Sequence, residues 1–183
     1  MNILFYIFII YLLLIIISPI RYIQFLPTIP IYPNSEKEVL LVEKQVNLRN
    51  KHDLDFFKLT DKSVSPAFSS IVPISIKELD DMITEFPIVF IISFFKYIIN
   101  RPRPKQIKPS LNVLTSISSN TPAYPAGHAF QAYYLAKKLG KSYPQVQPQL
   151  DAIAERCNSV RIKAGLHYPS DGEFSKQLVN FFY

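Results

Sequence analysis

Residues 161–171 read RIKAGLHYPSD, and this stretch decides how the C-terminal part of the chain is built. The apolar positions before it recur at helical spacing, which predicts a helix from Pro148 to about Ala164. Gly165 is expected to end this helix, and Pro169 to open the next one at its first position. The stretch therefore predicts two helices joined by a tight connection.

Three side chains near this connection have obvious roles in phosphate chemistry. Arg161, at the end of the first helix, can bind phosphate oxygens through its planar guanidinium. His167, when neutral, can attack phosphorus, and Asp171 in the first turn of the next helix can hold the imidazole in the reactive tautomer. A structural hydrogen bond between His167 and Asp171 is the alternative interpretation of the same spacing.

Upstream, residues 96–104 read KYIINRPRP and carry two more cations. Lys96 falls in the last turn of an apolar helix predicted over 86–99. Arg103 is expected on an extended segment, because the prolines on either side of it do not continue a helix. Lys96 and Arg103 can therefore converge on one anion. The alternative is a solvated basic loop after a core helix.

A third stretch, Pro125-Ala126-Gly127-His128, combines a predicted turn with a helix over 129–139 that is expected to end at Gly140. His128 thus falls at a helix start, where backbone amides point outward and favour a bound phosphate. Gly127 allows the backbone to approach a ligand closely. The alternative is a glycine turn with a capping histidine.

In chain order these stretches read Lys, six residues, Arg-Pro; then Pro-Ala-Gly-His; then Arg, five residues, His, three residues, Asp. This order resembles the three-part signature of the type 2 phosphatidic acid phosphatase superfamily. That superfamily includes lipid phosphatases, bacterial class A non-specific acid phosphatases and vanadium haloperoxidases. The resemblance covers roughly residues 90–175, about half of the chain. It implies an all-α helical bundle with the site between helix ends.

The resemblance also implies a role for each residue. His167 would be the nucleophile that forms a phosphohistidine, and Asp171 would orient it. His128 would protonate the leaving alcohol and then activate water. The substrate phosphate would be bound without a metal by a set of cations and a helix start: Lys96, Arg103, Arg161, Gly127 and Ala126. No cofactor is expected.

The chain departs from the family pattern at two positions. Ala126 stands where the family usually has Ser, and Val160 stands where it usually has Ser before the third-block Arg161. Loss of the first hydroxyl removes one phosphate donor, which is worth about 1 kcal/mol net for a neutral hydrogen bond. Slower catalysis is therefore expected, not its loss. The final helix, predicted over 172–183, is shorter than the family usually has.

Composition narrows the class of protein. A chain of 183 residues that is 49% hydrophobic fits one domain with a hydrophobic core and excludes a disordered protein. Its net charge of +6 suits an anionic substrate or a membrane surface, while the scattered Lys and Arg residues do not predict nucleic-acid binding. Cys157, the single cysteine, excludes an internal disulfide and is expected to be buried. His52 is expected at the surface.

The N-terminal residues 3–17, ILFYIFIIYLLLIII, are an unbroken apolar run. Residues 1–20 are interpreted as a single-pass membrane anchor, with a cleaved signal peptide and a buried core helix as alternatives. The proline-containing residues 21–35 are expected to form a linker, and residues 36–183 the catalytic domain. The predicted location is therefore a membrane, on a side that Arg21 alone does not decide.

The remaining patterns predict further helices and loops. They are a short helix over 36–47, a turn or two of helix over 53–59, a loop over 60–73, a helix capped by Ser75 with Glu78 three residues on, a buried core helix over 86–99, a loop over 105–124 and a linker over 144–148.

Three functions fit these observations. The first is a metal-independent phosphatase acting on a lipid phosphate or a small soluble phosphomonoester. The second is a haloperoxidase, in which the same cationic pocket would hold vanadate as the cofactor with His167 as its ligand. The third is a membrane-tethered anion-binding protein that has lost catalysis.

Overall fold

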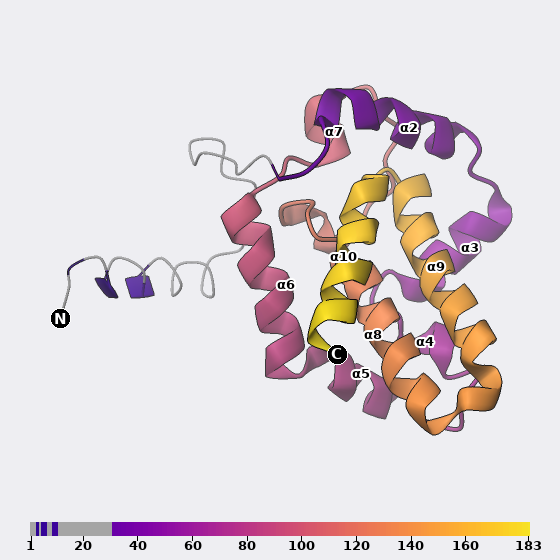
Figure 1. Cartoon of the computed structure of the whole chain (residues 1–183). Helices are drawn as coiled ribbons and strands as arrows, with labels where there is room; N and C mark the ends of the chain where they lie inside the picture. The colour runs from indigo at the N-terminus through magenta and orange to yellow at the C-terminus, as the bar shows by residue number, and fades with distance from the viewer. Residues whose placement is uncertain (1–2, 4, 7–8, 11–30) are drawn as a thin grey trace.

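A computed structural model of the chain describes residues 3, 5–6, 9–10 and 31–183. In these parts the chain is all-helical and has no strand, as the sequence predicts (Figure 1). The predicted anchor over 1–20 lies mostly outside the described residues, and so does the predicted linker over 21–35 as far as residue 30.

The described helices are joined by short segments. In chain order they are α2 (Ser35–Asn47), α3 (Lys51–Thr60), α4 (Ser65–Phe68), α5 (Ile76–Thr84), α6 (Phe86–Ile99), α7 (Pro104–Ile107), the 3-10 turn η1 (Ile117–Asn120), α8 (Gly127–Ser142), the 3-10 turn η2 (Pro144–Val146), α9 (Gln147–Lys163) and α10 (Pro169–Phe182).

Three long helices form the centre of the bundle. The short turn η2 joins α8 to α9, so that the two helices run side by side in opposite directions, and α10 packs along α8 (Figure 1). α2 and α3 pack against α9, while α5 packs against α8. Cys157 is buried in this core and His52 is exposed, as predicted. The largest fully buried apolar side chains include Phe68, Phe130, Leu135 and Leu150.

Several helix ends lie where the sequence predicts them. The Ser75 hydroxyl accepts the Glu78 amide at 3.2 Å, and the Glu78 carboxylate accepts the Ser75 amide at 3.0 Å, so the predicted capping box opens α5. Gly165 has a φ of 77°, the left-handed conformation that ends α9. Pro169 opens α10, which places Asp171 in its first turn.

Gly140 does not end α8, contrary to the prediction. The helix continues to Ser142, and a β carbon at Gly140 would lie 1.5 Å from Oε1 of Gln147. The glycine is therefore explained by the close approach of the Gln147 side chain and not by a turn. The predicted linker over 144–148 is also wrong, because η2 and the first turn of α9 occupy it.

The predicted loops over 60–73 and 105–124 contain short helices. α4 lies in the first, and α7 and η1 lie in the second. Proline fits the first turn of a helix, and both α4 and α7 have a proline there, which explains why a proline-rich composition does not exclude them. α3 also begins earlier than predicted, because Asn50 and Asp53 form a capping box before Lys51.

α6 is only half buried, although a buried core helix was predicted. Ile88 and Ile92 face the core, whereas Phe86 is 75% and Phe90 is 40% exposed. The rings of Phe86, Phe90 and Phe94 stack in succession along the outer face, with centroids 5.6 Å and 5.9 Å apart. α6 buries one face because it lies at the edge of the bundle (Figure 1).

Within the described residues, no single helix is long and apolar enough to cross a membrane. The segments Ile76–Thr84 and Phe86–Ile107 reach that length and composition only as a pair, and the pair is bent by 52°.

Candidate active site

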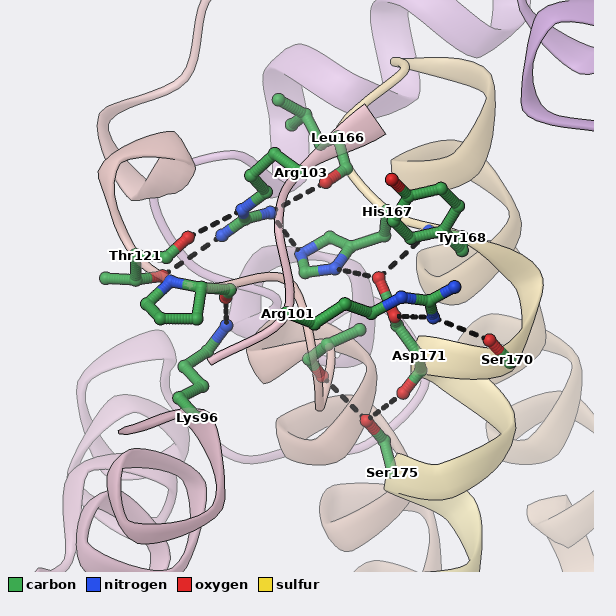
Figure 2. A network of polar contacts seen from close by, with 12 residues as sticks. Lys96, Arg101, Arg103, Thr121, Leu166, His167, Tyr168, Ser170, Asp171 and Ser175 are labelled. Carbon is green, nitrogen blue, oxygen red and sulfur yellow. Dashed lines mark hydrogen bonds and ion pairs between the residues drawn. The ribbon is translucent and has the colours of Figure 1, made fainter. Parts of the chain in front are cut away.

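The three stretches that carry the predicted site residues meet at one end of the bundle. α6 ends at Ile99 and is capped by Asn100, whose φ of 51° is a left-handed conformation that asparagine tolerates. The chain then runs extended, which carries Arg103 past the segment between α9 and α10 (Figure 2). Arg103 contacts His167, and the segment over 116–122 contacts Lys96, Arg103 and Arg161, so the four side chains share one site.

His167 and Asp171 form a buried pair. Nδ1 of His167 lies 3.0 Å from Oδ2 of Asp171, and the same oxygen accepts the backbone amide of Tyr168 at 2.9 Å. The imidazole is 2% exposed and the carboxylate is completely buried. The carboxylate is therefore held by the first turn of its own helix while it contacts the imidazole.

Arg103 defines the tautomer of His167. Its Nη1 lies 2.8 Å from Nε2 of the imidazole, and a guanidinium has only donors. Nε2 must therefore accept, and Nδ1 carries the proton that is donated to Asp171. This tautomer leaves the lone pair of Nε2 among the cations of the site.

Burial controls the charge of both members of the pair. Burial, together with the charges of Arg103 and Lys96, lowers the pKa of His167 well below its usual value, so the imidazole is neutral. Burial raises the pKa of Asp171 to about 6, although Arg101 and the Tyr168 amide act in the opposite direction. The pair is thus a neutral histidine beside a carboxylate that ionises near neutral pH.

Lys96 and Arg103 are buried without a carboxylate partner. Lys96 Nζ donates to the carbonyl of Pro122. Besides its contact with His167, the Arg103 guanidinium donates to three backbone carbonyls: Thr121 at 2.7 Å, Leu166 at 2.8 Å and Ser118 at 3.0 Å. It also donates to the Thr121 hydroxyl at 3.0 Å. Among the ion pairs of residues 31–183, none includes either cation. Burial and the charge of Arg103 lower the pKa of Lys96 well below its usual value.

Arg161 keeps two donors unused. Its Nη2 lies 2.8 Å from the carboxylate of Asp61, and its guanidinium carbon lies 4.9 Å from the centroid of the Phe57 ring. Its Nε and Nη1 are buried and have no hydrogen-bond partner. A guanidinium that is 1% exposed and has two donor nitrogens without a partner, with three N–H groups between them, is unfavourable unless an acceptor occupies the space in front of it.

His128 lies at the start of α8, as predicted. Its Nε2 lies 3.0 Å from the backbone carbonyl of Asp61 and must donate to it, because a carbonyl only accepts. Burial and the charge of Arg161 lower the pKa of His128 to about 3, so the imidazole is neutral here.

Ala126 and Gly127 form the start of α8 beside these groups. Ala126 is completely buried and donates its amide to the carbonyl of Asp171 at 3.1 Å. A β carbon on Gly127 would lie 3.5 Å from Ile92 and 3.8 Å from Lys96, which are ordinary contacts. A larger residue than Gly127 would therefore fit at this position without a clash, even though Gly127 lies beside the Lys96 side chain.

The segment over 116–122 closes the site. Its carbonyls and hydroxyls accept hydrogen bonds from Lys96 and Arg103. The hydroxyls of Ser116 and Ser118 accept from Arg161 at 3.2 Å and 3.1 Å. Two cavities lie beside this segment. One of about 230 Å³ is bordered by Arg103 and Leu114, and one of about 460 Å³ is bordered by Leu114 and Asp61.

Sequence reasoning missed three charged residues of this site: Arg101, Glu38 and Asp61. Arg101 contacts Asp171, and Glu38 contacts Arg101. One signal for Arg101 was available, because residues two apart on an extended segment point to the same side, and Arg101 lies two residues before Arg103. Glu38 and Asp61 give no such signal, since Glu38 in α2 and Asp61 at the end of α3 are both far from the site residues in the sequence.

In the part of the chain that the structure describes, no group of three or more His, Cys, Asp or Glu residues is arranged to hold a metal ion. Comparison with known proteins adds no relative: the chain matches no family model and no curated protein.

Proposed function

We propose that this chain is a phosphatase that hydrolyses a phosphomonoester through a phosphohistidine on His167, with no metal. The observation that carries the proposal is the unbalanced positive charge of the site. Lys96 and Arg103 are buried without a carboxylate, and Arg161 keeps two free donors. Buried cations are costly without an anion, and a phosphate supplies both the charge and the acceptors.

Substrate binding requires the segment over 116–122 to release the cations. Its carbonyls and hydroxyls are neutral acceptors, whereas phosphate oxygens carry charge and form stronger hydrogen bonds with Lys96 and Arg103. Arg161 would add its free Nε and Nη1. The cavity bordered by Leu114 and Asp61 gives room for the alcohol part of either a lipid phosphate or a small soluble ester.

In the first step, Nε2 of His167 attacks phosphorus once Arg103 has turned its donor to the substrate. The N–P bond forms, the ester P–O bond breaks, and the leaving oxygen takes a proton from His128. His128 is neutral in the closed site, so it must gain this proton when the phosphate binds. A phosphate dianion nearby favours the imidazolium and raises the pKa of His128.

In the second step, His128 takes a proton from water as the water oxygen bonds to phosphorus. The N–P bond breaks, inorganic phosphate leaves, and His167 regains its neutral form. Asp171 stabilises the imidazolium-like charge of His167 in the intermediate through the Nδ1 hydrogen bond. The cations stabilise the equatorial oxygens in both steps, which supplies most of the catalysis in phosphoryl transfer.

Phosphate release by the full chain in detergent, with EDTA present, tests the proposal. The substrates are p-nitrophenyl phosphate and short-chain phosphatidic acid, and the variants are His167→Ala and His52→Ala. We expect the first variant to lose about 10³-fold or more in kcat. The second is the matched control, since His52 is exposed and outside the site. Absence of hydrolysis by a folded wild-type chain would leave an anion-binding protein as the better interpretation.

A further inference from the structure

Arg101 is a fully buried arginine for which the proposed reaction has no direct use. It follows α6 by two residues and is 0% exposed. Its Nη1 lies 2.6 Å from Oδ1 of Asp171 and 2.7 Å from the Ser170 hydroxyl (Figure 2). Its Nη2 lies 2.7 Å from the carboxylate of Glu38. Arg101 therefore joins the carboxylate of the site to a second carboxylate on α2.

The start of α2 and the residues just before it complete the surroundings of Arg101. Pro33 contributes its carbonyl and Ser35 its hydroxyl, each 3.2 Å from the guanidinium. The guanidinium carbon lies 4.6 Å from the centroid of the Tyr32 ring and 3.8 Å from that of Tyr168. All three guanidinium nitrogens thus have acceptors, and aromatic rings cover the planar group.

These contacts fix the carboxylate that orients His167. Oδ2 of Asp171 accepts from His167 and Tyr168, while Oδ1 accepts from Arg101. Glu38 holds the same corner from the other side, because its two oxygens accept the amide and the hydroxyl of Ser170, each at 2.7 Å. The plane of the Asp171 carboxylate is therefore set by Arg101 at one oxygen and by His167 and the Tyr168 amide at the other.

We propose that Arg101 is a positioning residue for the His167–Asp171 pair, and that Glu38 and the segment Tyr32–Ser35 hold it in place. The inference rests on the proposed function. It makes α2 and the end of the predicted linker part of the working site, although none of the three signature stretches lies there. The competing explanation is a purely structural clamp that ties α2 to α10.

The charges around Asp171 separate these explanations. Arg101, Arg103 and Lys96 face it from α6 and the segment after α6, and His167 and the Tyr168 amide face it from the segment before α10. Glu38 acts through Arg101 from α2. Removal of the Arg101 charge disfavours the ionised carboxylate, whereas removal of the Glu38 charge favours it.

The test measures kcat, KM and the pH dependence of kcat for three variants of the full chain. For Arg101→Gln we expect kcat to fall about 10- to 100-fold, as for the outer partners that orient metal-bound histidines, with KM little changed. The acidic limb of its pH profile should move up by about one unit. Arg101→Lys should restore part of kcat, and Glu38→Gln should move the acidic limb down.

Arg49→Gln is the matched control. Arg49, two residues after α2, also ties its segment to distant ones, by donating to the carbonyls of Asn112 and Lys163 at 3.3 Å and 3.1 Å, and neither of these carbonyls belongs to a site residue. A purely structural role for Arg101 predicts that Arg101→Gln and Arg49→Gln both lose stability, as measured by urea unfolding, and that neither moves the pH profile.

A readout without substrate separates failure of the inference from failure of the proposed function. The Nδ1 proton of His167, bonded to Asp171, gives a downfield NMR signal whose pH dependence reports the carboxylate. We expect this titration to move up in pH in Arg101→Gln and to stay unchanged in Arg49→Gln. If the signal shifts in this way but the chain hydrolyses no phosphate ester, only the proposed phosphatase function is overturned. If the chain is active but the signal of Arg101→Gln titrates as in the wild type, the proposed role of Arg101 is overturned.

Discussion

Asp171→Asn is the substitution whose effect follows most directly from the geometry. One carboxylate oxygen accepts from Arg101 at 2.6 Å, and the other accepts from His167 and the Tyr168 amide. The Asn side chain offers one acceptor oxygen and one donor NH₂ group in place of two acceptor oxygens. If its oxygen stays on Arg101, its NH₂ group faces His167 Nδ1 and the Tyr168 N–H. The imidazole must then protonate Nε2, which opposes Arg103 and removes the nucleophilic lone pair.

Two losses set the magnitude. The wrong tautomer of a catalytic histidine lowers kcat by about 10⁴-fold in the serine protease triad, where the equivalent carboxylate was replaced by an amide. The substitution also leaves Arg101 with a single carboxylate, and removing one partner of a buried ion pair costs about 3–5 kcal/mol. We therefore expect a loss of kcat of about 10³- to 10⁴-fold and a lower free energy of unfolding.

The assay is p-nitrophenol release, with the free energy of unfolding from urea titration of the same preparations. Asp53→Asn is the matched control, because Asp53 pairs with Lys163 at 2.9 Å and also accepts the Asn50 amide at the start of α3, where it contacts no residue of the site. Such a pair contributes about 0–1 kcal/mol and should not affect kcat. If Asp171→Asn keeps more than a tenth of the wild-type kcat while remaining folded, the tautomer argument is wrong.

Three further expectations follow from particular contacts. Gly165→Ala should destabilise the fold by about 1–2 kcal/mol or more in urea unfolding, because φ is 77° and the new β carbon would lie 2.9 Å from Val113; an unchanged midpoint would contradict this. Asp61→Asn removes the carboxylate that competes with phosphate for Arg161 but keeps the backbone carbonyl that accepts from His128. Inorganic phosphate should therefore inhibit hydrolysis at several-fold lower concentration than in the wild type, and weaker inhibition would argue against an anion site at Arg161. Because the pKa of Asp171 is raised to about 6 and the ionised form is the active one, kcat/KM should fall as pH drops through that value; a profile flat to pH 4 would show that the carboxylate stays ionised.

Local patterns predicted much of the fold. Capping at Ser75, the left-handed stop at Gly165 and the proline at the start of α10 are each set by residues close in the sequence, so they could be predicted from it. Gly140 was interpreted wrongly because its role is to admit the side chain of Gln147, which only the packing of α9 on α8 reveals. The outer face of α6 was misjudged because hydropathy does not say which side of a helix is covered.

The residues of the candidate site also divide into those that the sequence led us to expect and those that it did not. The expectation that Lys96, Arg103, His128, Arg161 and Asp171 lie around His167 came from the resemblance that the three stretches carry. The contribution of Glu38 could not be predicted, because it reaches Ser170 across 132 residues of sequence and depends on how α2 lies over α10. The closure of the site by the segment over 116–122 was equally hidden, since it is formed by backbone carbonyls that any residue carries.

The central claim, that His167 becomes phosphorylated, is tested most directly by trapping the intermediate. The full chain would be mixed with a labelled phosphate ester and quenched in alkali within milliseconds, and the label would be located by mass spectrometry of peptides. We predict a phosphate on His167 that is stable in alkali, is lost in acid, and is absent from His167→Ala but present in His52→Ala. Hydrolysis that proceeds with no phosphate on His167, or with the same label in His167→Ala, would contradict the account.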